Sequence, residues 1–130
     1  MPTRRVMLGL FAAISLLSRP GASAAETTVY SPAAFEAAQK SGQSILVHIT
    51  APWCTTCAAQ KPILAKLSVE PRFKALQVFE VDFDSRKDVV RQLGATMQST
   101  LITFKGGKET GRSVADTKPE GIAALLDKAI

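Results

Sequence analysis

Two cysteines, Cys54 and Cys57, are the residues of this 130-residue sequence best suited to do chemistry. They are the only cysteines of the chain, and two residues separate them, directly after a strand-like run and at the expected start of a helix. At that position, free backbone N–H groups and the helix dipole favour a thiolate, which makes Cys54 the expected nucleophile. Cys57, about one turn further along the helix, is expected to resolve the mixed disulfide that Cys54 forms.

The same pair of thiols has other interpretations. A purely structural disulfide would close a very small loop and restrict the unfolded chain little, so its stabilising effect would be modest. A metal site usually takes four ligands, whereas the chain offers two thiols and one histidine, so zinc would need carboxylates or a second subunit. Soft thiolates also suit copper or, across a dimer, an iron–sulfur cluster. We assign no metal ligand and no cofactor from the sequence.

His48 and Trp53 are the other residues near the pair that could take part in chemistry. Histidine does acid–base work near neutral pH, so His48 is a candidate for moving the proton of Cys57, and we place it with the two cysteines among the catalytic residues. The alternative is a buried strand histidine that has a hydrogen-bond partner and no catalytic part. Trp53 is expected to be partly exposed, either as a lid over the cysteines or as part of a substrate-contact surface.

The elements that position these residues alternate between strands and helices, which predicts an α/β fold. The apolar, β-branched run 45–50 is typical of a strand buried on both faces, and it leads directly to the helix of the cysteines. Pro62 lies inside that helix and should kink it. In chain order, we predict a strand at 26–30 on a sheet edge and a helix that is capped by Ser31, has Pro32 in its first turn, continues through 33–40 and ends around Gly42. There follow a strand at 45–50, a helix at 54–68, a turn at 71–75, a strand at 76–83, a helix at 85–93, a strand at 100–104, a hairpin through Gly106 and Gly107 to a strand at 109–114, and a helix at 119–130.

Capping patterns predict two of the helix starts. Ser85 followed by Asp88 resembles a capping box, and Thr117 followed by Glu120 resembles a second one. Two further carboxylates end a strand just before the first of these helices. We expect turn and capping duty from them rather than catalysis; they are Asp82 and Asp84.

The first 24 residues are typical of a secretory signal peptide: a pair of arginines, an apolar run at 6–17, and small residues before Ala24. A helix needs about 20 apolar residues to span a bilayer, and this run is shorter. The alternative to a cleaved signal peptide is an uncleaved membrane anchor. We expect a signal peptide at 1–24, a single domain at 25–130, and export to an extracytoplasmic compartment, most naturally a bacterial periplasm. The Sec and twin-arginine routes both stay open.

Composition fits one folded domain, because 46% of the residues are apolar. The formal charge of +5 falls when the expected signal peptide is removed: it holds three of the 16 basic residues, and the other 13 against 11 acidic residues leave +2. Since basic and aromatic residues do not cluster, we expect no nucleic-acid partner. We expect a monomer without stable membrane insertion after cleavage.

With these motifs in place, the sequence resembles the thioredoxin superfamily over nearly all of 27–130. The run 51–57, APWCTTC, is similar to the family's active-site loop and helix start. Pro62 falls at its helix-kinking proline, and 101–108 is similar to its terminal strand and glycine hairpin. The resemblance implies the thioredoxin-like fold, a central mixed β-sheet flanked by helices, with the first cysteine as nucleophile and the second as resolving thiol.

Two departures from the family concern the site. The family has a cis-proline just before its fourth strand, opposite the cysteines, where this sequence has Ser99. A cis bond before serine costs about 3 to 4 kcal/mol, so we expect a trans peptide. The family contacts substrate through this loop, and we assign substrate contact to Gln98, Ser99 and Thr100 together with Trp53. Ser99 could place its hydroxyl near the sulfurs, or its small side chain could leave room for a metal or an iron–sulfur cluster.

The second departure is His48, which stands where the family buries an acidic side chain.

We therefore expect an enzyme, a thiol-disulfide oxidoreductase that exchanges disulfides with protein substrates outside the cytoplasm. Thr55 and Thr56, between the cysteines, carry no charge and no imidazole, which favours a reductase or isomerase-like direction over a strong oxidase. A reductase in an oxidising compartment needs electrons from a membrane redox partner. The alternative function is a copper or iron–sulfur carrier of the same fold.

Overall fold

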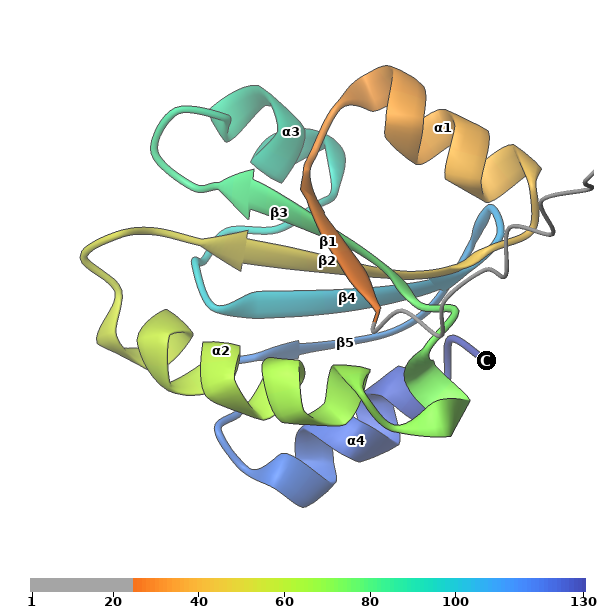
Figure 1. Ribbon diagram of the computed structural model, residues 1–130. Coiled ribbons are helices and arrows are strands. Elements are labelled where there is room, and N and C mark those ends of the chain that lie inside the picture. Colours follow the sequence, from red (N-terminus) through yellow and green to blue (C-terminus); the bar gives the residue numbers. More distant parts are fainter. Residues whose placement is uncertain (1–24) are drawn as a thin grey trace, which may run out of the picture.

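The computed structural model describes residues 25–130, which form one five-stranded sheet with helices on both faces (Figure 1). The expected signal peptide, 1–24, lies outside the described residues. The strands are β1 (Glu26–Val29), β2 (Ser44–Thr50), β3 (Gln77–Asp82), β4 (Thr100–Lys105) and β5 (Lys108–Val114). The helices are α1 (Pro32–Lys40), α2 (Thr55–Ser68), α3 (Lys87–Gln92) and α4 (Pro119–Asp127), with a 3-10 turn at Pro71–Phe73. The predicted order of strands and helices is confirmed.

The sheet has the order β1-β3-β2-β4-β5 and is mixed. β1 and β2 both run parallel to β3, whereas β4 runs antiparallel to β2 and to β5. β1 is an edge strand, as predicted, and β2 is the central strand, with 45–50 buried throughout. Because α2 follows β2 after a short loop, the cysteines stand at the end of the central strand.

The two faces of the sheet are different in chemistry. Neighbouring residues of a strand point to opposite faces, so β2 contributes to both. The side covered by α1 and α3, here the α1/α3 face, buries aromatic rings whose centroids lie 5.2 to 6.2 Å apart. The side covered by α2 and α4, the α2/α4 face, has an aliphatic core and also carries His48. The first core includes Tyr30, Phe35, Ile45, Val47, Ile49, Phe79 and Phe104, and the second includes Leu46, Leu67, Leu101, Ile122, Leu125 and Leu126.

The helix α2 connects the cysteines to the first described residue. It is 14 residues long and continues through Pro62. Cys54 is its N-cap and Cys57 lies in its first turn; at its other end, the carbonyl of Ser68 accepts the N–H of Ala25 at 3.1 Å. The segment that enters β1 is thereby held at the C-terminal end of α2.

The helix α1 begins as the sequence predicts, but α3 does not. The Oγ of Ser31 accepts a hydrogen bond from the third residue of α1. The N-cap of α3 is Arg86, with no side-chain cap, so the capping box predicted at Ser85 is wrong. The reason is a competing acceptor: Oδ1 of Asp82 accepts both the hydroxyl of Ser85, at 3.0 Å, and its N–H, at 2.8 Å. The turn role expected of Asp82 is confirmed.

The capping box predicted at Thr117 and Glu120 is also wrong. The N-cap of α4 is Lys118, and no side chain caps this helix. Instead, Oδ1 of Asp116 accepts the N–H of Lys118 at 2.9 Å and holds the turn that enters the helix. α4 ends at Asp127, before the predicted end of the final helix.

Candidate active site

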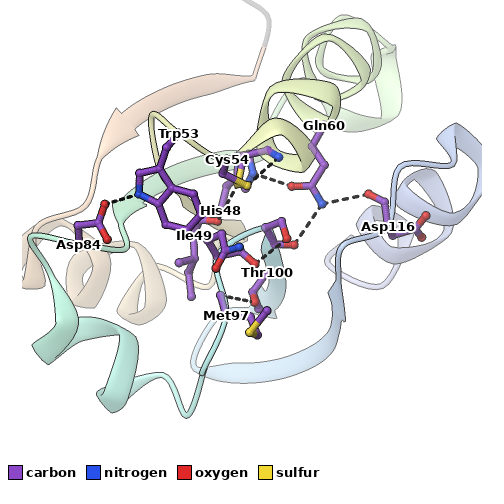
Figure 2. Close-up of a disulfide and its surroundings, with 12 residues drawn as sticks. His48, Ile49, Trp53, Cys54, Gln60, Asp84, Met97, Thr100 and Asp116 are labelled. Atoms are coloured by element: carbon purple, nitrogen blue, oxygen red, sulfur yellow. Dashed lines mark hydrogen bonds between the residues drawn. A yellow bond between two sulfur atoms is a disulfide. The ribbon is translucent and has the colours of Figure 1, made fainter.

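Cys54 and Cys57 form a disulfide at the start of α2 (Figure 2). Cys54 is the N-cap residue: its N–H donates to the carbonyl of Ala51 at 3.1 Å, and its sulfur accepts the N–H of Cys57 at 3.0 Å. This N–H and the positive end of the helix dipole favour a thiolate at Cys54 once the disulfide is reduced. The predicted position of the pair at a helix start is confirmed.

The cysteines differ in their access to solvent. Cys54 keeps 5% of its surface exposed and Cys57 keeps 1%, in a small cluster with Ala51 and the partly buried Phe83. The sulfur of Cys57 also lies 4.0 Å from the carbonyl of Ile49 in β2. Cys54 is thus the more accessible cysteine of the pair, and the order of attack stays a prediction.

Trp53 lies on the surface beside the disulfide and is 58% exposed, so the expected partial exposure is confirmed. Its indole N–H donates to Oδ2 of Asp84 at 2.6 Å, across the loops that follow β2 and β3. The carboxylate of Asp84 therefore orients the tryptophan rather than capping a turn, which corrects the prediction for this residue.

His48 is 1% exposed on the α2/α4 face. Its Nε2 lies 2.9 Å from Oε1 of Gln60, a residue of α2 one turn beyond Cys57. Burial lowers the pKa of His48 below its ordinary value, while the hydrogen bond with Gln60 and the negative charge of Glu80 act to raise it. Near neutral pH the ring is therefore uncharged, with the capacity to accept a proton.

A cavity of about 180 Å³ adjoins His48 between β3 and α2. Its walls are mostly aliphatic, and its charged lining residues are Lys61 of α2 and Glu80 of β3. Glu80 is the cross-strand neighbour of His48 in the parallel pair of β2 and β3. The buried imidazole of His48 thus adjoins the cavity with its two charged lining residues and also contacts the side chain of Gln60.

Gln60 is a site residue that we did not predict from the sequence. It is fully buried, and its side-chain N–H groups donate to the carbonyl of Ser99 at 3.1 Å and to that of Asp116 at 3.0 Å. A signal was present: Gln60 precedes Ile63, Leu64 and Leu67 by one and two helical turns, so this polar residue shares the apolar face of α2. A glutamine on such a face needs buried partners.

The peptide before Ser99 is trans, as predicted, and no cis bond occurs within 25–130. Ser99 has φ +56 and is 3% exposed. Its hydroxyl donates to the carbonyl of Gln98 at 2.6 Å, so it is used within the loop rather than in a hydrogen bond with either sulfur. The carbonyl of Ser99 accepts two donors, the side chain of Gln60 and the N–H of Ala115, the latter at 3.0 Å.

The residues assigned to substrate contact fall into two groups. Trp53 is exposed and Gln98 is half-buried, whereas Ser99 and Thr100 are buried, with Thr100 paired to Ile49 in the sheet. A solvent-facing side chain that we did not assign is that of Met97, which is 48% exposed. Figure 2 shows the loop from Met97 to Thr100 in the immediate surroundings of the disulfide.

Within 25–130, no three or more His, Cys, Asp or Glu side chains come together in a group suited to a metal ion. None of the described helices combines the length and the apolar character that crossing a membrane requires.

The thioredoxin family model matches residues 26–128. Trxlp from Edwardsiella tarda, known from a crystal structure, is 39% identical in sequence with a TM-score of 0.76, covering 78% of this chain and 98% of that one. A thioredoxin of Aspergillus fumigatus is 30% identical over 90 residues, 69% of this chain and 82% of the relative. A thioredoxin of Chlamydia muridarum is 32% identical over 84 residues, 65% of this chain and 80% of the relative. The chain belongs to the thioredoxin family and is a thiol-disulfide oxidoreductase with Cys54 and Cys57 as its redox pair.

Proposed function

We propose that the protein is an exported thioredoxin that reduces or rearranges disulfides in protein substrates. The observation that carries the proposal is the position of Cys54. Its sulfur caps α2, accepts the N–H of Cys57 at 3.0 Å and belongs to the more exposed cysteine of the pair. The exposed side chain of Trp53 beside it, and that of Met97 in the neighbouring loop, offer apolar surface to a folded or partly folded partner.

The reaction is an exchange of two electrons between a dithiol and a disulfide. The thiolate of Cys54 attacks one sulfur of the substrate disulfide, a mixed disulfide forms, and the other substrate sulfur leaves as a thiolate and takes up a proton. Cys57 loses its proton and attacks the sulfur of Cys54. The second substrate thiolate leaves, and the two enzyme sulfurs form the disulfide that the structure contains.

His48 is proposed as the acceptor of the proton that Cys57 gives up. The ring lies on the sheet face that α2 covers, and its partner Gln60 lies one turn beyond Cys57. Burial lowers the pKa of His48, so the ring is neutral near neutral pH. Because Nε2 lies against the amide oxygen of Gln60, the proton of Cys57 would be taken up at Nδ1. Replacement of His48 by Gln should slow resolution of the mixed disulfide and flatten its pH profile. An unchanged profile would leave His48 with a structural role only.

Substrate contact is proposed for Trp53, Gln98 and the backbone of Ser99 and Thr100. The side chains of Ser99 and Thr100 are buried, the carbonyl of Ser99 already accepts two hydrogen bonds, and Thr100 pairs with both neighbouring strands. A substrate would therefore meet these two residues only through backbone groups of the loop that these bonds leave open.

The direction and the compartment of the reaction are proposed from the sequence. Thr55 and Thr56 supply no charge to hold a strongly stabilised thiolate, which favours reduction or isomerisation. Residues 1–24 support export, most naturally to a periplasm, where reduction would need a membrane protein as electron donor. Fractionation and mass spectrometry of the exported protein test this: an N-terminus at Ala25 supports it, and an intact N-terminus in the cytoplasm contradicts it.

The central experiment combines a measured reduction potential with capture of substrates. Cys57→Ala should retain substrates as mixed disulfides on Cys54, and the matched double variant Cys54→Ser/Cys57→Ala should retain none. Wild-type protein should reduce insulin and behave as a monomer in sedimentation. The strongest periplasmic oxidants have a reduction potential of about −120 mV, and a similar potential for the Cys54–Cys57 pair would contradict the proposed direction. A metal-loaded, coloured protein without insulin reduction would favour a metal carrier instead.

A further inference from the structure

Three segments that surround the disulfide meet at the side chain of Gln60. Its Oε1 lies 2.9 Å from Nε2 of His48 in β2. Its amide nitrogen donates to the carbonyl of Ser99, just before β4, and to that of Asp116, just before α4. Because Gln60 is 0% exposed, no water competes for these bonds. One buried amide therefore ties the central strand, the Ser99 loop and the entry to α4 to the helix of the cysteines (Figure 2).

The partners fix which way round the amide of Gln60 lies. The two backbone groups that it meets are carbonyls, which only accept, so the NH₂ group must face Ser99 and Asp116. The oxygen must then face His48, and a ring nitrogen next to it must donate. The neutral imidazole of His48 consequently carries its proton on Nε2 and leaves Nδ1 unprotonated.

The two loops joined by Gln60 have uncommon backbone conformations. Ser99 has φ +56 and Ala115 has φ +59, the two non-glycine residues with positive φ in the described chain. They contact each other directly, because the N–H of Ala115 donates to the carbonyl of Ser99. Such conformations persist only where the surroundings hold them. No proline ring restricts the backbone at Ser99. The hydrogen bonds of Gln60 instead hold both the Ser99 loop and the Ala115 loop in place.

We propose that Gln60 is a positioning residue that holds the Met97–Thr100 loop in the shape needed to receive a protein substrate, and that it sets the tautomer of His48. The inference rests on the proposed function, because it takes this loop as the substrate contact. The loop is close to the sulfurs through the sheet: Thr100 pairs with Ile49, whose carbonyl lies 4.0 Å from the sulfur of Cys57. Gln60 itself acts through this loop and through His48.

The test is Gln60→Met, which keeps the length of the side chain and removes its hydrogen bonds. Reduced protein is reacted with insulin, a protein disulfide, and with cystamine, a small disulfide without a peptide backbone. The ratio of the insulin rate to the cystamine rate should fall about tenfold in Gln60→Met, because only the peptide substrate needs the shaped loop. The exposed Gln92→Met is the matched control and should leave the ratio as in wild type. An equal loss on both substrates, or no loss, overturns the role in recognition.

A second measurement needs no variant. His48 is the only histidine, so nitrogen NMR of the wild-type protein reports its ring without assignment ambiguity. The ring should be the Nε2–H tautomer, and Gln60→Met should weaken that preference. A wild-type ring protonated mainly on Nδ1 overturns the proposal, even if the variant does not fold. Wild-type protein that attacks cystamine but not insulin would contradict the proposed function instead, and the tautomer would still decide whether Gln60 orients His48.

Discussion

The two faces of the sheet divide stability and chemistry between them. On the α1/α3 face, Phe35 touches the rings of Tyr30, Phe79 and Phe104, and the core is apolar throughout. On the α2/α4 face, the aliphatic core gives way at its cysteine end to a buried imidazole and a buried amide. The same strand, β2, supplies both faces through alternate residues.

The two faces differ in what they require of buried groups. The apolar face gains stability from every ring that it buries, without any requirement for hydrogen bonds. Buried polar atoms on the other face need partners: Gln60 satisfies its own amide and Nε2 of His48, whereas the buried hydroxyl of Thr50, two residues further along β2, has none among the described residues. The residues proposed for proton transfer thus lie on the face whose buried groups need hydrogen-bond partners. Substitutions on this face should lower activity, and substitutions on the apolar face should lower stability.

The largest effect is expected from Cys54→Ser, at the N-cap of α2. A hydroxyl does not attack disulfides at neutral pH, so insulin reduction should be lost completely. Thermal unfolding should match that of the reduced wild type, because the change is confined to one atom. Insulin reduction by the variant would contradict the assignment of Cys54 as nucleophile.

The opposite result is expected from Phe79→Ala on the α1/α3 face. Phe79 is 2% exposed and lies against the rings of Tyr30 and Phe35. Its removal should lower the free energy of unfolding by about 3 to 5 kcal/mol, from lost burial and a cavity. Activity per folded molecule, measured well below the unfolding midpoint, should stay as in wild type. The exposed Val29→Ala is the control and should alter stability little; a drop in activity of folded Phe79→Ala would break the division of roles.

His48 should make the free energy of unfolding depend on pH. The α1/α3 face, whose core is apolar, should contribute no such dependence. Since the folded pKa of His48 is lowered, the unfolded chain binds the proton first as pH falls. The stability that neutral His48 supports is complete above its ordinary pKa of about 6.5 and is lost as pH falls through the lower folded value. Unfolding by urea at a series of pH values should show this loss in wild type and not in His48→Gln. An identical loss in both proteins would assign it to other groups.

The smallest effect is expected from Asp84→Asn at the rim of the site. The exposed indole of Trp53 should lose a charge-assisted hydrogen bond and become more mobile, which should raise the KM for insulin by about twofold. Trp53 is the only tryptophan, so its fluorescence reports the change directly. Asp88→Asn, on α3, is the matched control because that exposed carboxylate contacts Arg86. Unchanged fluorescence and KM would show that Asp84 does not orient the indole.

The features that the sequence predicted are those set by neighbours in the chain. The cap of α1 by Ser31 needs only residues three apart, and the burial of β2 follows from its apolar run. The position of the cysteines followed from the same local order of strand, loop and helix. The trans peptide before Ser99 follows from the intrinsic cost of the cis form.

The features that the sequence did not predict depend on contacts between distant segments or on competition between nearby acceptors. Gln60 bonds to backbone groups 39 and 56 residues away, which no local pattern specifies. Asp84 meets Trp53 across 31 residues. At Ser85 the sequence has the pattern of a capping box, but the hydroxyl of Ser85 donates to the carboxylate of Asp82 and does not cap α3. Local motifs are therefore unreliable where a second acceptor lies within a few residues.

The bond between Ala25 and Ser68 has a consequence for maturation. If a signal peptidase cuts after Ala24, as proposed, the new α-amino group appears on the residue that already rests against the last turn of α2. A positive charge near the C-terminal end of a helix is favourable by about 0.3 to 1 kcal/mol. Processing would then do more than detach the leader: the freshly exposed ammonium would strengthen the far end of the helix whose beginning holds the reactive sulfur.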